Sequence, residues 1–281
     1  MKETNRNFIR LSDLTEEDVK NIFQIADSLQ EGKYENALKG KTIVMFFPAS
    51  SIRTRVTFEK GIYLLGGQSI LFEPATLDKK EDIGDVIGYL NNWADGLVVR
   101  YPDISMLDKI EEYARMPVIN AMTDVNHPCE MLADLYALSK RRADYTKAGY
   151  LFVGAAGNIG YAWKEASELF GFSLEQCCPA KYKMENVPWH DSILEAARGK
   201  DIICTDSLSG DKLPDFAGYQ VTSEVMEEAA ENALLNPCPP FFRGEEVSAE
   251  VIESNYFVGY DFKEYLLQIQ QAILIYTVQN R

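Results

Sequence analysis

The chain has 281 residues, of which 46% are hydrophobic, so it is long and apolar enough to bury the cores of two domains. Its 28 Lys+Arg and 43 Asp+Glu residues give a formal net charge of −15, and an acidic chain of this kind is a poor partner for nucleic acids or anionic membranes. No apolar run is long enough to span a bilayer, and residues 1–7 lack an apolar signal core, so we expect a cytoplasmic protein. Because the five cysteines form no C-x-x-C pair, we expect neither disulfides nor a bound metal.

The first half of the chain alternates between strand and helix patterns. Hydroxyl and acidic residues at 12–18 predict the start of a helix that continues to about residue 29. Apolar runs and helical spacing predict the elements that follow. The predicted strands cover 42–47, 68–72, 96–100 and 117–120, and the predicted helices begin after Arg53, cover 83–93 and run from Pro128 to the basic residues at 140–142.

The second half continues the alternation, with strands predicted at 149–154, 202–205 and 233–235 and a single C-terminal helix predicted over 262–280. Strands that alternate with helices indicate parallel α/β sheets, in which ligands bind beyond the carboxyl ends of the strands. Arg53, Arg100 and His127 each follow such an end in the first half. We therefore expect these three residues to share one site.

The segment Ser50–Arg55 lies at the junction between the strand at 42–47 and the helix after it, and it carries hydroxyl and guanidinium side chains. Free backbone N–H groups and the positive end of the helix dipole favour an anion at such a junction. Arginine adds planar, paired donors that match phosphate oxygens. One interpretation is a site for a small phosphorylated compound. The other is an ordinary capped helix whose arginines are solvated.

The segment Gly154–Gly160 also follows a strand and opens a helix. Its glycine spacing differs from that of the dinucleotide fingerprint G-x-G-x-x-G, although Glu175 follows at about the expected distance. Three interpretations stay open: a nicotinamide site, a tight strand-to-helix turn, or a turn from which Asn158 reaches a substrate.

Four motifs in order resemble the aspartate/ornithine carbamoyltransferase family: Ser51–Arg55, Arg100, His127–Glu130 and Asn236–Pro239. The resemblance extends to the start of the first helix and to the loop at 79–83. It implies an α/β protein with two Rossmann-like domains whose parallel sheets are joined by interdomain helices. A carbamoyl-phosphate domain would cover 1–126, with the helix at 262–281 packed back on it, and an amine-acceptor domain would cover 127–261. It also implies a homotrimer with active sites at subunit interfaces.

The resemblance assigns roles to individual residues. It implies catalytic roles for Arg53, Thr54, Arg100 and His127, the last three polarising the carbamoyl carbonyl. It implies substrate contacts for a larger set: Ser51, Ile52, Arg55, Lys80, Glu130, Asn158, Asp206, Pro237 and Cys238. In this family an amine attacks the carbonyl and phosphate leaves, so preorganised donors and the alignment of two substrates supply the catalysis. We expect neither a metal ion nor a cofactor.

Several positions depart from the family pattern. Ile52 stands where the family has a hydroxyl residue, Asn236 replaces a histidine, and Leu266 stands where ornithine enzymes carry an arginine. Glu130 replaces the glutamine that lies near the carbamoyl NH₂ group. A carboxylate there either selects an unusual acceptor through a cationic group or accepts a hydrogen bond from the NH₂ group.

The sequence therefore predicts a carbamoyltransferase that moves the carbamoyl group of carbamoyl phosphate to the amino group of an amino acid or diamine. The first alternative is a catalytically silent homologue that binds ligand without turnover. The second is a nicotinamide-dependent dehydrogenase, which would depend on the glycine-rich turn.

Overall fold

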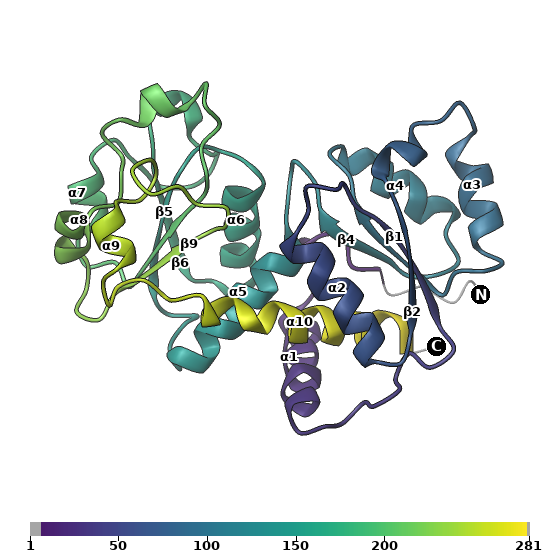
Figure 1. Cartoon of the computed structure of the whole chain (residues 1–281). Coiled ribbons are helices and arrows are strands. Elements are labelled where there is room, and N and C mark those ends of the chain that lie inside the picture. The colour runs from purple at the N-terminus through teal and green to yellow at the C-terminus, as the bar shows by residue number, and fades with distance from the viewer. Residues whose placement is uncertain (1–6, 280–281) are drawn as a thin grey trace. The chain divides into compact units, whose positions relative to one another are not determined.

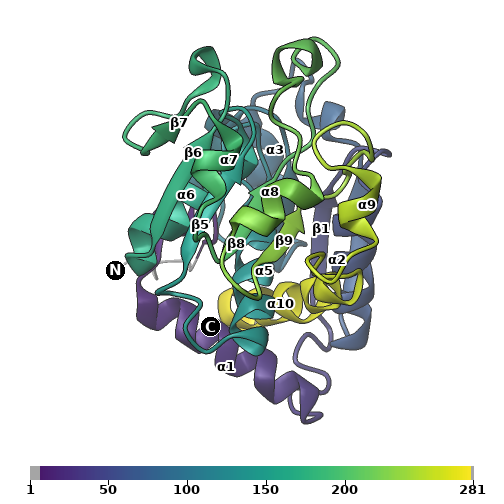
Figure 2. The same ribbon diagram turned by 90° about the vertical axis from the view of Figure 1, so that its left-hand side faces the viewer.

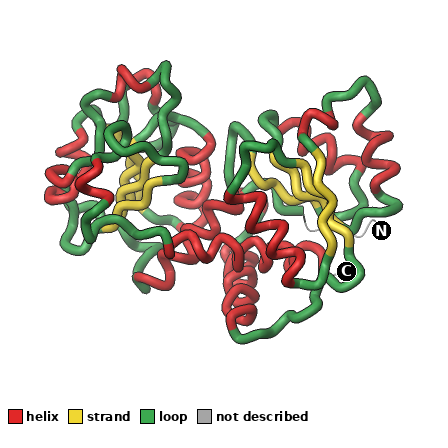
Figure 3. The backbone as a smooth tube through the Cα atoms, in the orientation of Figure 1, coloured by secondary structure: helices red, strands yellow, loops and turns green. Residues whose placement is uncertain are grey.

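The computed structural model describes residues 7–279 (Figure 1). Contacts divide the chain into two compact units: a first unit that ends at Ala137 and resumes at Lys263, and a second unit from Leu138 to Phe262. The division falls inside helix α5 (Pro128–Arg141) and not before residue 127, so residues 127–137 belong to the first unit. Figure 3 shows a separate sheet in each unit.

The first unit contains a four-stranded parallel sheet with the order β2-β1-β3-β4. Its strands are β1 (Thr42–Phe46), β2 (Gln68–Phe72), β3 (Gly96–Arg100) and β4 (Val118–Met122). Its helices, apart from α5, are α1 (Glu16–Gln30), α2 (Arg53–Leu64), α3 (Ile83–Leu90), α4 (Ile104–Tyr113) and α10 (Tyr265–Leu274). Strands β1, β3 and β4 are apolar and buried almost throughout, as expected for parallel strands covered on both faces.

Apolar side chains of α3 and α4 pack on one face of this sheet, where Ile87 and Leu107 join a core with Val44, Leu97 and Val118. Helix α1 begins at Glu16 with the predicted capping arrangement, in which the Thr15 hydroxyl accepts from the Asp18 backbone N–H. The prediction of a single uninterrupted C-terminal helix over 262–280 is wrong. The segment forms a 3₁₀ turn at Asp261–Glu264, then α10, then a π-helical turn at Ile275–Gln279.

The second unit contains a five-stranded parallel sheet with the order β7-β6-β5-β8-β9. The view in Figure 2, turned by 90° from that of Figure 1, labels these five strands. The strands are β5 (Gly149–Val153), β6 (Ser173–Cys177), β7 (Trp189–His190), β8 (Ile202–Thr205) and β9 (Leu234–Pro237). The helices are α6 (Asn158–Phe170), α7 (Ile193–Ala197), α8 (Ser223–Glu228) and α9 (Ala249–Ile252). The predicted α/β class with parallel sheets is confirmed. Among the helices of residues 7–279, none is long and apolar enough to cross a membrane.

Candidate active site

The strand order of the first unit points to one edge of its sheet. Strand β1 connects to β2 on one side, whereas β3 connects to β4 on the other, so the order reverses between β1 and β3. Ligands of such sheets bind beyond the carboxyl ends of the strands at the reversal point. Ser51 follows the end of β1, Arg100 ends β3, and His127 follows β4.

Ser51 and Arg100 are in direct contact at this edge, because Nη1 of Arg100 donates a hydrogen bond of 2.9 Å to Oγ of Ser51. Burial lowers the pKa of Arg100, and the nearby charge of Arg53 lowers it further. Two guanidinium groups within repulsive range are stabilised by a shared anion. Thr54, which follows Arg53 in the first turn of α2, is buried, and no side chain caps the start of this helix. The first turn of α2 and the two arginines therefore suit a phosphate group.

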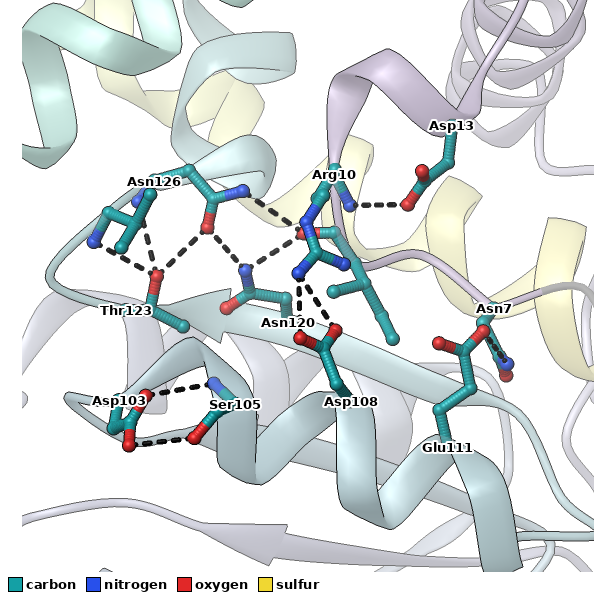
Figure 4. A network of polar contacts seen from close by, with 12 residues as sticks. Asn7, Arg10, Asp13, Asp103, Ser105, Asp108, Glu111, Asn120, Thr123 and Asn126 are labelled. Carbon is teal, nitrogen blue, oxygen red and sulfur yellow. Dashed lines mark hydrogen bonds and ion pairs between the residues drawn. The ribbon is translucent and has the colours of Figure 1, made fainter.

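A buried amide network fixes the loop that leads to His127 (Figure 4). Oδ1 of Asn126 accepts hydrogen bonds from Nδ2 of Asn120 at 2.7 Å and from the Thr123 hydroxyl at 3.0 Å. Asn120 also donates to the backbone carbonyl of Ile9 at 2.9 Å. Because Asn120 and Asn126 are fully buried, breaking this network would leave polar groups unsatisfied. The network therefore holds the residue before His127 in one place.

His127 is a buried, neutral imidazole. Burial lowers its pKa to about 4, in spite of the opposing charge of Glu130, so the ring is uncharged at neutral pH. Its Nδ1 atom is buried and has no hydrogen-bond partner among the described residues. A neutral imidazole can donate one hydrogen bond to a carbonyl oxygen without adding a further cation beside Arg100.

A cavity of about 450 Å³ opens at the same edge of the first sheet. Arg100 lines it, whereas Ser51, Arg53 and His127 do not. A ligand in this cavity would therefore meet the guanidinium of Arg100. The other lining residues come mostly from the loops after β2, β3 and β4: Pro48, Glu73, Pro74, Ala75, Asp78, Tyr101, Pro102, Met122, Thr123 and Asp124.

The second unit has its own strand-order reversal, between β5 and β8. Asn158 begins α6 after β5, and Asp206 directly follows β8. Pro237 ends β9, and the backbone N–H of Cys238 donates to the carbonyl of Thr205 at 3.0 Å, which ties the ends of β8 and β9 together. These four predicted residues thus follow neighbouring strands of one sheet.

Two family models match the chain. Residues 6–140 match the carbamoyl-P binding domain of aspartate/ornithine carbamoyltransferase, and residues 147–277 match its Asp/Orn binding domain. The chain belongs to the aspartate/ornithine carbamoyltransferase family. It is therefore a carbamoyltransferase, an enzyme that moves the carbamoyl group of carbamoyl phosphate to an amine.

Sequence relatives align with nearly the whole chain. The ornithine carbamoyltransferase of Nitrosococcus oceani is 35% identical over 291 residues, which cover 95% of this chain and 96% of the relative. That of Syntrophotalea carbinolica is 31% identical over 295 residues, covering 96% and 98%. The solved ornithine carbamoyltransferase from Pyrococcus furiosus has a TM-score of 0.93 at 26% identity and covers 100% of this chain and 99% of its own.

The glycine-rich turn of this carbamoyltransferase has a packing explanation. A Cβ atom on Gly154 or Gly160 would lie 2.9 Å or 2.8 Å from the Phe152 ring, so both positions exclude larger residues. Glu175, the acidic residue at about the expected distance from the glycines, contacts Lys200 and lies 2.6 Å from Nε2 of His190. These contacts favour the tight-turn interpretation over a nicotinamide site.

Three predicted site residues have no polar contact with the cluster around Arg100 in the described part of the chain. Ile52 is 69% exposed, and Lys80 lies in an exposed loop before α3. Nε of Arg55 forms an ion pair of 2.8 Å with Glu59 along α2. Within the described chain, none of the three forms a hydrogen bond or ion pair with Arg100, His127 or Ser51, which leaves their roles in the carbamoyltransferase as predictions.

Glu130 of the carbamoyltransferase pairs with a cation of the chain itself. Nζ of Lys263 lies 2.8 Å from Oε1 of Glu130. Burial acts to raise the pKa of Glu130, but Lys263, His127 and Arg53 together lower it. The sequence offered no signal for Lys263, because it lies 133 residues from Glu130 in a segment without a motif.

Two carboxyl groups of the second unit have raised pKa values. Burial raises the pKa of Asp206 to about 6. Burial also raises the pKa of Glu246 to about 7, with smaller contributions from the charges of Glu245 and Asp206. Oε1 of Glu246 accepts from the Phe242 backbone N–H at 2.7 Å, and its buried Oε2 has no partner among the described residues. Sequence reasoning missed Glu246, since it resembles the exposed acids around it.

We expect Glu246→Gln to stabilise the protein above neutral pH. The pKa of about 7 in the folded state exceeds the ordinary value of 4.5, so the folded state binds the proton more tightly and loses stability as pH rises through this window. The free energy of unfolding should increase by up to about 3 kcal/mol at pH 8 and change little at pH 4. Urea denaturation at both pH values measures this. The exposed control Glu250→Gln should change neither value, and a Glu246→Gln effect that is equal at both pH values would contradict the prediction.

Proposed function

We propose that this carbamoyltransferase transfers the carbamoyl group to the amino group of an amino acid or diamine that carries a second, cationic group. Ornithine is the first acceptor to test, because the relatives are named ornithine carbamoyltransferases. The proposal that carbamoyl phosphate is the carbamoyl donor depends on one observation, the contact of Arg100 with Ser51. Arg100 and the nearby Arg53 form a partly desolvated cationic pair at the start of α2.

In the proposed reaction the uncharged amine attacks the carbamoyl carbon, a C–N bond forms, and the C–O bond to phosphate breaks. The proton of the amine leaves with the phosphate. Negative charge grows on the carbonyl oxygen and on the bridging oxygen. Thr54, Arg100 and His127 are assigned to the carbonyl oxygen, and Ser51 and Arg53 to the phosphate. Donors held in place before the reaction stabilise such charge without reorganisation.

The charges of the second unit support a cationic acceptor over a dicarboxylate. A second substrate carboxylate calls for an available guanidinium group. Each of the four arginines in this unit already has a carboxylate partner: Arg141 has Asp261, Arg142 has Asp144, Arg198 has Glu228 and Arg243 has Glu253. Asp206, in contrast, is a partly desolvated carboxyl group that would gain from a cation.

An acceptor panel tests the proposal. The enzyme would be incubated with carbamoyl phosphate and ornithine, lysine, putrescine or aspartate, and both the ureido product and phosphate would be measured. We expect a diamino compound to exceed aspartate in kcat/KM by at least about 100-fold, which reflects one satisfied buried charge. Preference for aspartate would reject the acceptor assignment. Binding of carbamoyl phosphate by calorimetry without turnover of any amine would favour the catalytically silent alternative.

We expect Asp206→Asn to raise KM for the diamino acceptor by about 10–100-fold, because a charge-assisted hydrogen bond is lost, while KM for carbamoyl phosphate stays within about threefold. The ratio of acceptor KM in Asp206→Asn to that in the natural enzyme should fall as pH falls through about 6, since Asp206 is then protonated. Protonation of the attacking amine affects both proteins and cancels in this ratio. Initial rates between pH 5.5 and 8 measure both effects. The matched control is Asp211→Asn, on the exposed part of the same loop. Equal acceptor KM in Asp206→Asn and the control would contradict the role.

The proposal includes a homotrimer. Large apolar side chains are exposed at the N-cap of α2, along α2 and on the edge strand β2, and a group of exposed apolar side chains is typical of an interface between protein chains. The residues are Ile52, Val56, Tyr63, Leu64, Ile70 and Phe72. In a trimer, the exposed Lys80 loop would be available to a neighbouring subunit. Light scattering on the purified protein tests the assembly, and a monomer at working concentration would reject it.

A further inference from the structure

Lys263 forms a buried cluster with two carboxylates of α5. Its Nζ atom lies 2.8 Å from Oε1 of Glu130 and 2.5 Å from Oδ1 of Asp134. Glu130 and Asp134 are four residues apart, so they lie on one face of the helix. The side chains of Lys263, Glu130 and Asp134 are only 19%, 9% and 5% exposed, so solvent and salt screen their charges weakly.

Glu130 also interacts through its charge with groups of the candidate donor site. Burial and the charge of Arg53 lower the pKa of Arg100, whereas the charge of Glu130 raises it. Glu130 likewise opposes the effect of burial on His127. Its carboxylate is therefore within electrostatic range of Arg53, Arg100 and His127, while its one hydrogen-bond partner in the described part of the chain is Lys263.

A carboxylate in this place needs a cation of its own. Arg53 and Arg100 are shared with the phosphate once carbamoyl phosphate binds, so they can no longer balance Glu130. An unpaired, buried carboxylate beside a dianion would take up a proton. A neutral glutamine, which the family carries here, has no such requirement. Glu130 in place of the family's glutamine therefore requires a cation, and Lys263 supplies it.

We propose that Lys263 is a positioning residue that keeps Glu130 ionised and holds its carboxylate in place, so that Glu130 accepts a hydrogen bond from the carbamoyl NH₂ group of carbamoyl phosphate. This inference rests on the proposed function, because it assigns one end of that donor to Glu130. Lys263 itself does not contact the substrate. Its effect should fall on the carbamoyl end of the ligand and not on the phosphate end.

Calorimetry with two probes, carbamoyl phosphate and inorganic phosphate, separates the two ends. The ratio of the two Kd values reports how much the carbamoyl group contributes to binding. A general loss of positive charge weakens the binding of both probes and therefore leaves the ratio unchanged. We expect Lys263→Met to weaken the binding of carbamoyl phosphate relative to that of inorganic phosphate by at least about tenfold. This is the loss expected for one charge-assisted hydrogen bond. Lys263→Arg should keep the ratio within about threefold. If Lys263→Met does not fold, Lys263→Gln removes the charge and keeps a donor.

A double-mutant cycle excludes a merely structural role. In the Glu130→Gln background the amide needs no ammonium, so adding Lys263→Met should leave the ratio within about threefold. Asp134→Asn, which preserves the Glu130–Lys263 pair, should also leave it unchanged. An equal effect of Lys263→Met in both backgrounds, or no effect in the natural protein, would overturn the inference. Failure of the natural protein to bind carbamoyl phosphate at all would instead overturn the proposed function.

Discussion

Arg100→Met is expected to lower kcat/KM for carbamoyl phosphate by about 10³-fold, because one guanidinium serves both binding and charge stabilisation in the transition state. Arg100 ends β3, donates to Ser51 and lies within range of Arg53, so its removal disrupts the centre of the donor site. Methionine retains much of the side-chain volume without the charge. Steady-state kinetics with varied carbamoyl phosphate measures the loss.

The matched control for Arg100→Met is Arg115→Met, an exposed arginine of the same unit that follows α4. It should keep kcat/KM within about twofold, as surface substitutions generally do. Thermal unfolding of both variants separates a catalytic loss from unfolding. Activity of Arg100→Met within tenfold of the natural enzyme would argue against the donor site proposed for it.

His127→Gln is expected to lower kcat by about 10²–10³-fold, since it removes a preorganised donor to the carbonyl oxygen and puts a flexible amide in its place. The amide network around Asn126 remains in the variant, so the loop should keep its position. Single-turnover rates with saturating substrates measure the chemical step. A loss below about threefold would place the carbonyl outside the reach of His127.

The pH dependence of the same variant tests the charge state of the imidazole. Because burial lowers the pKa of His127 to about 4, the ring stays neutral from pH 6 to pH 8. The ratio of natural to variant activity should therefore be constant across this range. A ratio that changes near pH 6.5, the ordinary value for histidine, would show that the imidazole titrates there and acts as a cation.

Local patterns predicted most of the strands. The runs at 96–100 and 202–205 match β3 and β8, because buried parallel strands are short, continuous apolar segments that end at polar turns. The run at 68–72 matches β2, an edge strand whose residues alternate between exposed and half-buried. Helix α4 was not predicted, although Asp103 caps it by accepting from the Ser105 backbone N–H. That signal was present in the sequence. Its short amphipathic pattern between two strands was not recognised.

The candidate donor site was predictable for a related reason. Parallel strands place their carboxyl ends at one edge, so residues that follow successive strands are brought together whatever their distance in the chain. The contact of Arg100 with Ser51 joins the last residue of β3 to a residue that follows β1, and the sharing of one site by Arg53, Arg100 and His127 stays a prediction. In the second unit Asn158 and Asp206 were indicated by the family resemblance, and the structure places both after the strands at the reversal point.

By itself the sequence determined the fold class, the approximate positions of most strands and the identity of the cationic and hydroxyl groups that follow them, because these depend on local periodicity and chain order. Tertiary structure alone decided which charges are paired and which are desolvated. Lys263 reaches Glu130 across 133 residues, and Asn120 reaches Ile9 across 111. Burial and the distance between charges set pKa values and hydrogen-bond partners, and neither quantity exists until distant segments pack together.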